Sequence, residues 1–99
     1  MITATFTKSE QNLSLKVEGH AGYAQHGKDI VCASASILAY TLASFVMNVD
    51  GSVVELASAD TTIECETDDE SIINAFDYAK RGYELLALNY PQYVKLIQL

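Results

Sequence analysis

Several side chains in residues 19–36 could do chemistry, and one of them is the thiol of Cys32. If Asp29 caps a helix that begins at Ile30, Cys32 lies in the first turn, where unpaired N–H groups and the helix dipole stabilise an anion. Helix N-termini are known positions of cysteines that ionise readily, although most free cysteines are small buried core residues. The loop before Cys32 holds three glycines and both histidines, and such a loop favours a reactive thiol over a structural one.

A cysteine nucleophile needs a base for its proton and an acid for the leaving group, and an imidazole can serve as both near neutral pH. His20 directly follows Gly19 at the end of an expected strand, so its position should be fixed more rigidly than that of His26 in the middle of the loop. We therefore predict that His20 pairs with Cys32, and we interpret His26 as a surface or structurally satisfied residue.

Asp29 and Ser36 are candidate supporting residues, and each has a structural alternative. The cap role alone explains Asp29, although a carboxylate near an imidazole could also orient it. Ser36 lies one helical turn after Cys32 on the same face, where it could form a hydrogen bond in the site or serve as a small packing residue. Glycines give a loop unusual backbone freedom, and we expect three of them to act as hinges of a lid over the substrate. These glycines are Gly19, Gly22 and Gly27.

The same residues do not suit a metal or a nucleotide. His20, His26 and Cys32 are separated by five residues each, there is no Cys-x2-Cys pair, and Cys65 is far away in an expected strand. The Gly-x-Gly-x-x-Gly and P-loop spacings are absent. We predict no metal site and no cofactor, and we interpret Cys65 as a core residue rather than the partner of a disulfide or a redox switch.

Alternation of apolar and polar residues predicts the strands around this loop. The expected strands cover residues 2–7, 13–18, 53–57, 61–66 and 93–99. Short loops at residues 8–12 and 58–60 join the first two strands and the next two, so we expect two antiparallel hairpins.

Spacings of three and four between apolar residues predict an amphipathic helix from Ile30 to about Asn48. Its apolar residues are Ile30, Ile37, Leu38, Leu42, Phe45, Val46 and Val49. A capping-box pattern at residues 67–70 opens a second helix, which Pro91 ends near residue 89. Gly82 inside this helix costs ~1 kcal/mol against alanine, which indicates a close contact with another segment.

These elements predict an α+β fold with two layers. We expect residues 1–99 to form a single domain in which two helices pack on a mostly antiparallel sheet, in the order β-β-α-β-β-α-β. A chain of 99 residues, 49% of them hydrophobic, is long and apolar enough to bury one core.

The net charge of −7 argues against a nucleic-acid interface. Residues 50–77 contain nine acidic residues and no lysine or arginine, which predicts either a solvated face or an attraction for a basic partner. No apolar run approaches the ~20 residues that span a bilayer, and residues 1–6 lack the basic and apolar regions of a signal peptide. We therefore expect a cytoplasmic protein with reduced thiols and no membrane partner.

The segment from residue 19 to residue 36, GHAGYAQHGKDIVCASAS, resembles the signature of the bacterial ribosomal-processing cysteine proteases, the Prp family. The resemblance lies in His-Ala-Gly-Tyr-Ala at 20–24 and in Gly-x-Asp-Ile-Val-Cys at 27–32, and the whole chain agrees in length, element order and acidity. Relatives often carry Ala-Ala-Val-Ser after the cysteine, whereas this chain has Ala-Ser-Ala-Ser at 33–36, so the serine is kept and the changes involve small residues.

The resemblance implies a cysteine endopeptidase that removes a short N-terminal extension from a protein of the large ribosomal subunit and forms a homodimer. The catalytic cysteine and histidine of the family fall on Cys32 and His20, and its further site residues, an aspartate and a serine, fall on Asp29 and Ser36. The acidic residues support an alternative function, a non-catalytic module that docks on a basic ribosomal protein during ribosome assembly.

Overall fold

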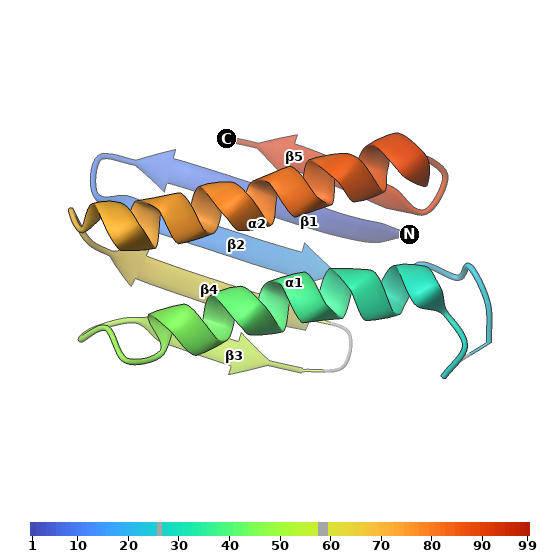
Figure 1. Cartoon of the computed structure of the whole chain (residues 1–99), viewed down its shortest axis with the longest axis horizontal. Coiled ribbons are helices and arrows are strands. Elements are labelled where there is room, and N and C mark those ends of the chain that lie inside the picture. Colours follow the sequence, from blue (N-terminus) through green and yellow to red (C-terminus); the bar gives the residue numbers. More distant parts are fainter. Residues whose placement is uncertain (26, 58–59) are drawn as a thin grey trace.

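A computed structural model describes residues 1–25, 27–57 and 60–99 of the chain. Its helices and strands follow one another in the expected order (Figure 1). They are β1 (Ile2–Ser9), β2 (Asn12–Glu18), α1 (Ile30–Val46), β3 (Val53–Leu56), β4 (Asp60–Glu66), α2 (Glu70–Asn89) and β5 (Val94–Gln98). The interpretation of His26 and the expected turn at Ser58 and Ala59 lie outside the described residues.

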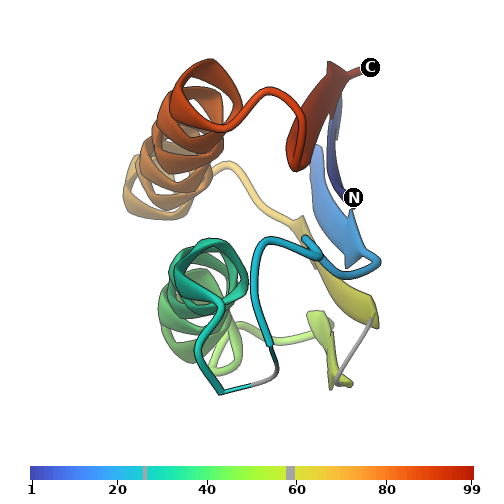
Figure 2. The ribbon, with the colours of Figure 1, turned by 90° about the vertical axis from the view of Figure 1, so that its right-hand side faces the viewer.

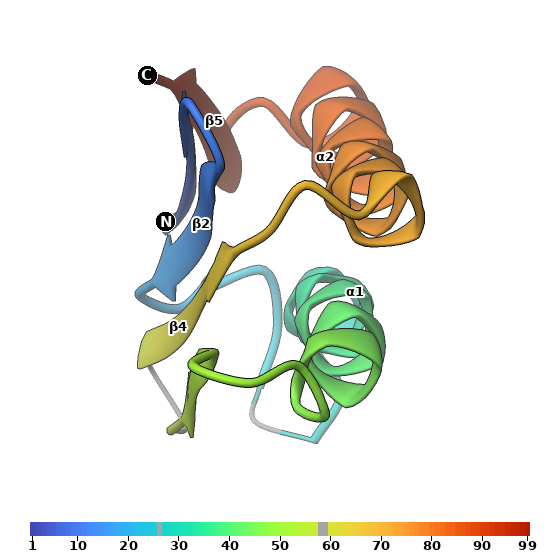
Figure 3. The ribbon, with the colours of Figure 1, turned by 90° about the vertical axis from the view of Figure 1, so that its left-hand side faces the viewer.

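The strands form one mixed sheet in the order β3-β4-β2-β1-β5. All neighbouring strands are antiparallel except β1 and β5, which are parallel. Figures 2 and 3 show that α1 and α2 lie side by side on one face of this sheet and leave the other face uncovered. This arrangement confirms the predicted two-layer α+β fold.

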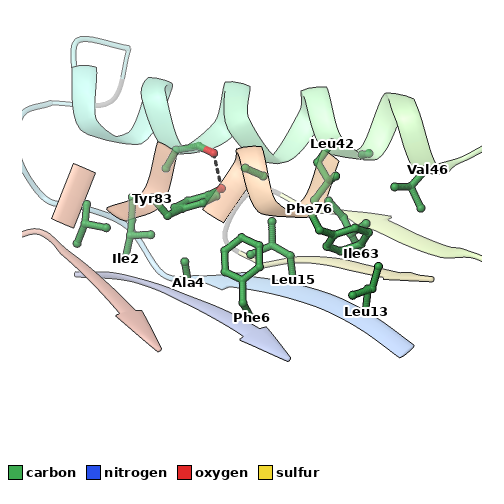
Figure 4. Close-up of a cluster of buried hydrophobic side chains, with 14 of the residues drawn as sticks. Ile2, Ala4, Phe6, Leu13, Leu15, Leu42, Val46, Ile63, Phe76 and Tyr83 are labelled. Carbon is green, nitrogen blue, oxygen red and sulfur yellow. Dashed lines mark hydrogen bonds between the residues drawn. The ribbon is translucent and has the colours of Figure 1, made fainter. Parts of the chain in front are cut away.

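The core lies between the sheet and the two helices (Figure 4). In β1, β2 and β4 the apolar residues alternate with polar ones, so that Phe6, Leu15 and Ile63 line up across three strands and point toward the helices. Tyr83 of α2 is fully buried in this core, and its hydroxyl donates a 2.7 Å hydrogen bond to the backbone oxygen of Ala35. Burial raises the pKa of the Tyr83 phenol. The bond joins α2 to the part of α1 that follows Cys32.

Helix α1 buries only part of its predicted apolar pattern, in which Leu42 and Val46 are buried. Ile30, Ile37 and Phe45 belong to the apolar pattern but are 53%, 61% and 50% exposed. The buried residues are mostly smaller and comprise Val31, Ala35, Ala39, Leu42, Ala43 and Val46. Small side chains allow α1 to approach the sheet and α2 closely, and this close packing leaves the larger apolar residues on the outside.

The ends of the helices agree with the expected ones to within three residues. Helix α2 begins at Glu70, but its cap is Asp69 rather than Thr67, the first residue of the capping-box pattern. The Asp69 carboxylate accepts hydrogen bonds from the hydroxyl and the N–H of Ser71, and these bonds hold the pKa of Asp69 below its usual value. The Thr67 hydroxyl accepts a bond from the N–H of Asp69 instead. Helix α2 ends at Asn89, as predicted, and α1 ends at Val46.

Helices α1 and α2 contact each other closely at Gly82, as its position inside a helix predicted. A Cβ atom on Gly82 would lie 2.5 Å from Cδ2 of Leu38, so only a glycine fits here without movement of that leucine. In the part of the chain that the structure describes, neither helix is long and apolar enough to cross a membrane.

Candidate active site

A cavity of about 600 Å³ opens between the start of α1, the loop at residues 19–29 and the ends of β2 and β4. Its walls include every residue that the sequence suggested for catalysis, support or hinges. These residues are Gly19, His20, Gly22, Gly27, Asp29, Cys32 and Ser36. The fold therefore brings the predicted catalytic pair and the predicted supporting residues to one place.

Cys32 is half-buried and reaches the cavity from the first turn of α1. Its Sγ atom accepts a 3.2 Å hydrogen bond from the backbone N–H of Ala21, the residue that follows His20. The thiol thus lies beside a backbone N–H and at the positive end of the α1 dipole. Cys65 is also a free thiol, but it is buried in the core, and burial raises its pKa. Cys32 is thus the accessible one of the two thiols.

The Asp29 carboxylate binds two parts of the chain at once. Its Oδ1 atom accepts hydrogen bonds from the N–H groups of Val31 (3.0 Å) and Cys32 (2.9 Å), which confirms the predicted helix cap. Its Oδ2 atom accepts bonds from the N–H groups of Tyr23 (3.0 Å) and Ala24 (3.3 Å) in the loop. One carboxylate therefore fixes the loop to the helix start that carries the candidate nucleophile.

Opposing effects act on the pKa of Asp29. Partial burial raises the pKa of this carboxyl, but hydrogen bonds from the N–H groups of Cys32, Ala24 and Tyr23, together with one from the Cys32 side chain, outweigh burial and hold the pKa below its ordinary value. The carboxylate is thus ionised at neutral pH. Among the described contacts none joins it to His20, so its visible role is to hold backbone rather than to orient the imidazole.

His20 is exposed and faces the same cavity as Cys32. It follows Gly19, whose φ of +87° is the left-handed conformation that glycine adopts readily. A Cβ atom at Gly19 would also collide with the carbonyl oxygen of Met1, so the chain can turn here only with glycine. The imidazole makes no hydrogen bond within the described ranges, which leaves it free to approach Cys32 or a bound peptide.

Ser36 is exposed and lines the cavity one turn after Cys32. Its exposure disfavours the interpretation as a packing residue. The described ranges give its hydroxyl no partner, so hydrogen bonding in the site remains a prediction for this residue. The described ranges also contain no group of three or more His, Cys, Asp or Glu side chains that could hold a metal ion.

Sequence reasoning missed how the loop is held. The donors to Cys32 and Asp29 are backbone N–H groups, which every residue except proline carries, so residue types give no signal for them. It also missed that the Tyr23 ring packs against Tyr90 and Tyr93, which are more than sixty residues away in the chain. No spacing in the sequence marks such a distant contact.

Comparisons with known proteins concern the family and the fold of the chain. The family model described as "Cysteine protease Prp" matches residues 1–95. The ribosomal processing cysteine protease Prp of Bacillus subtilis (strain 168) is 36% identical over 53 residues, which cover 52% of this chain and 47% of that protein. The matched segment thus spans about half the length of this curated relative.

Solved structures show the same fold over the whole chain. A crystal structure of the ribosomal processing protease Prp from S. aureus, in complex with a covalently linked product peptide, superposes with a TM-score of 0.84 at 18% identity and full coverage of both chains. A crystal structure of a protein from Streptococcus mutans superposes with a TM-score of 0.75 at 29% identity and covers 100% of this chain and 96% of that one. Because the family model accounts for nearly all of the sequence and the fold agrees with it, the chain belongs to the Prp family of cysteine proteases.

Proposed function

We propose that this protein is a cysteine endopeptidase in which Cys32 is the nucleophile and His20 is the general base and acid. One observation carries the proposal: the Cys32 thiol, at the start of a helix and bonded to a backbone N–H, faces the same open cavity as the His20 imidazole. A thiolate beside an imidazole is the arrangement that peptide-bond cleavage by a cysteine requires. Residues 1–99 would then act as one catalytic domain.

The reaction proceeds in two halves. His20 takes the proton of Cys32, and the thiolate forms a C–S bond with the peptide carbonyl carbon while the C=O electron pair moves to oxygen. When this oxyanion collapses, the C–N bond breaks and the imidazolium gives its proton to the leaving amine. Water, activated by His20, then attacks the thioester, which releases the acid product and restores the Cys32 thiol.

The oxyanion needs hydrogen-bond donors close to the sulfur. The N–H groups of Val31 and Cys32 are already bonded to Asp29, so they are not available. The N–H of Ala21 lies 3.2 Å from Sγ and is therefore next to the carbon that the sulfur attacks. We assign this loop N–H as an oxyanion donor, with Asp29 as the residue that holds the loop and Ser36 as a supporting residue of the cavity wall.

The substrate we propose is an N-terminal extension of a protein of the large ribosomal subunit. The family assignment and the name of the Bacillus subtilis relative, a ribosomal processing protease, support this substrate. Ribosomal proteins are made and assembled in the cytoplasm, which is also where a catalytic thiol stays reduced. The acidic residues of the chain would attract a basic substrate protein and speed its encounter with the site.

We also propose that the protein forms a homodimer through the outer face of its helices. That face exposes aliphatic and phenylalanine side chains, which comprise Ile30, Ile37, Phe45, Leu85 and Leu88. A soluble monomer seldom exposes so many large apolar residues on one layer. Sedimentation of an Ile37→Glu variant should show a shift from dimer to monomer, whereas Lys95→Glu on the uncovered face of the sheet should leave the dimer intact. A monomeric parent protein would contradict this arrangement.

Cleavage can be tested by incubation of the protein with an N-terminally extended large-subunit ribosomal protein and mass measurement of the products. Cys32→Ala and His20→Ala should abolish cleavage and leave the far-UV circular dichroism unchanged. His26→Ala, a histidine change in the same loop, should keep most of the activity. If the Cys32→Ala protein still cuts the extension, the assignment of the nucleophile is wrong.

The alternative function, a non-catalytic docking module, makes a different prediction for the thiol. A nucleophilic Cys32 reacts with iodoacetamide well below the free-thiol pKa of ~8.5, whereas a structural cysteine does not. Cys65 is buried and contributes little to this measurement. Slow alkylation at neutral pH, together with tight binding of the ribosomal protein by Cys32→Ala, would favour the docking function.

A further inference from the structure

Three tyrosines join the loop of the site to the connection between α2 and β5. The Tyr23 ring lies 5.6 Å from the Tyr90 ring and 5.2 Å from the Tyr93 ring, measured between centroids, with interplanar angles of 82° and 79°. These are edge-to-face contacts, the geometry that the charge distribution of aromatic rings favours. The three residues, which we call the tyrosine cluster, lie outside the lining of the cavity.

Tyr90 and Tyr93 form the fixed side of the tyrosine cluster. Both pack partly buried against the core, and the N–H of Tyr90 donates to Leu86 at the end of α2. The N–H of Tyr93 donates to Tyr90, and the carbonyl of Tyr93 accepts from Ile2 at the start of β1. The backbone of both residues is therefore held by a helix end and by the sheet rather than by the loop.

Tyr23 is the loop side of the tyrosine cluster, and this residue is 42% exposed. Its backbone N–H donates to Asp29, so Tyr23 is held by its ring at one end and by its amide at the other. Ala21, which donates to Cys32 Sγ, is two residues away, and His20 is three residues away. The tyrosine cluster therefore holds the loop two residues from Ala21 and three residues from His20.

We propose that Tyr23 is a positioning residue of the active site. Its ring, seated against Tyr90 and Tyr93, keeps the N–H of Ala21 on the sulfur of Cys32 and keeps His20 at the cavity. Tyr23 acts through the loop, because it lies outside the lining of the cavity. The effect on cleavage rests on the proposed protease function, whereas the effect on the thiol does not.

The test compares Tyr23→Ala with Tyr23→Phe, which keeps the ring, and with Tyr78→Ala, which removes an exposed tyrosine of α2 that takes part in none of the aromatic pairs of the described residues. The first measurement is the rate of Cys32 alkylation against pH. Loss of a hydrogen bond to the thiolate should raise the pH of half-maximal rate by about one unit in Tyr23→Ala. Three other titratable side chains of the described residues line the cavity with Cys32, namely those of His20, Asp29 and Tyr40. They are unchanged in all three variants.

The second and third measurements are hydrogen exchange of residues 19–25 and cleavage. Tyr23→Ala should exchange these amides faster and lose about tenfold in kcat with little change in KM, because the substrate still meets the same cavity walls. Tyr23→Phe and Tyr78→Ala should match the parent protein in all three measurements. A melting temperature close to that of the parent shows that the fold is intact; if Tyr23→Ala unfolds, Tyr23→Leu replaces it.

An unchanged alkylation profile and unchanged exchange in a folded Tyr23→Ala protein would overturn the positioning role, whatever the cleavage assay shows. Parent protein that fails to cleave any extended ribosomal protein would instead refute the protease function. In that case the alkylation and exchange measurements still decide whether the tyrosine cluster holds the loop.

Discussion

The Asp29 carboxylate both caps α1 and holds the loop. These two roles can be separated because α2 offers a matched cap. Asp69 caps α2 with the same side chain, but none of its described contacts involves the site loop. We therefore expect Asp29→Ala and Asp69→Ala to weaken their helices in the same way. Only Asp29→Ala should also release the loop that carries His20.

The expected loss of stability for Asp29→Ala follows from its four hydrogen bonds. Loss of an N-cap costs about 1 kcal/mol. The bonds from Tyr23 and Ala24 have a charged acceptor but lie at the surface, where water replaces them, so together they contribute about 1 kcal/mol more. The free energy of unfolding should fall by about 2 kcal/mol, and in a domain of this size the melting temperature should fall by about 10 °C.

A third variant, Asp29→Ser, distinguishes the cap from the loop contact. A serine hydroxyl can cap α1, but its single oxygen cannot also reach the N–H groups of Tyr23 and Ala24. Asp29→Ser should therefore lose about half as much stability as Asp29→Ala and yet show the same change in Cys32 alkylation against pH. Thermal melts monitored by circular dichroism and iodoacetamide alkylation provide the two measurements.

Two results would refute this reasoning. If Asp29→Ala and Asp69→Ala lose the same stability and neither changes the alkylation of Cys32, the contacts of Asp29 with the loop contribute nothing in solution. If Asp29→Ser alkylates like the parent protein, the cap alone controls the thiol and the loop does not.

Two further predictions concern stability. Gly19→Ala should lower the free energy of unfolding more than Gly51→Ala, by about 1–2 kcal/mol in urea titrations, because both have positive φ but only Gly19 also meets the Met1 carbonyl; equal losses would contradict the contact. The carboxyls of Asp29 and Asp69 have pKa values below the usual 3.8, so they stabilise the fold above pH 4, and this stability should disappear as pH falls through their folded values. Urea midpoints between pH 7 and pH 2.5 test this, and Asp69→Asn should weaken the acid dependence because asparagine caps without titrating.

Most of the fold could be predicted because its signals are local. Alternation in β1 and β2 marks a half-buried hairpin, Asp29 is a favoured cap, and Pro91 cannot continue a helix. Each of these constraints acts over a few residues and leaves a pattern in the sequence. His20 and Cys32 lie near the two ends of one short loop and line the same cavity, whereas their pairing stays a prediction.

The face of α1 and the cap of α2 could not be settled in this way. Apolar residues surround most of α1, so a spacing of three and four is satisfied by several faces, and contacts with the sheet and α2 select the one with small side chains. At the start of α2, Thr67 and Asp69 are both favoured caps, and only the path of the chain after β4 decides between them. Contacts between residues far apart in the sequence therefore decide both the buried face of α1 and the cap of α2.

The geometry around the sulfur depends mainly on the backbone of the loop. The N–H of Ala21 holds Sγ, the N–H groups of Tyr23 and Ala24 hold Asp29, and Gly19 sets the direction in which the chain leaves β2. Backbone donors are present whatever the side chain, so most substitutions in the loop leave these bonds in place as long as the loop keeps its path. Among the described contacts that fix this path are three further points: a glycine against Met1, one carboxylate and one aromatic ring. The active site should therefore be sensitive to changes at these three points, even though two of them, Gly19 and Tyr23, have no reactive group of their own.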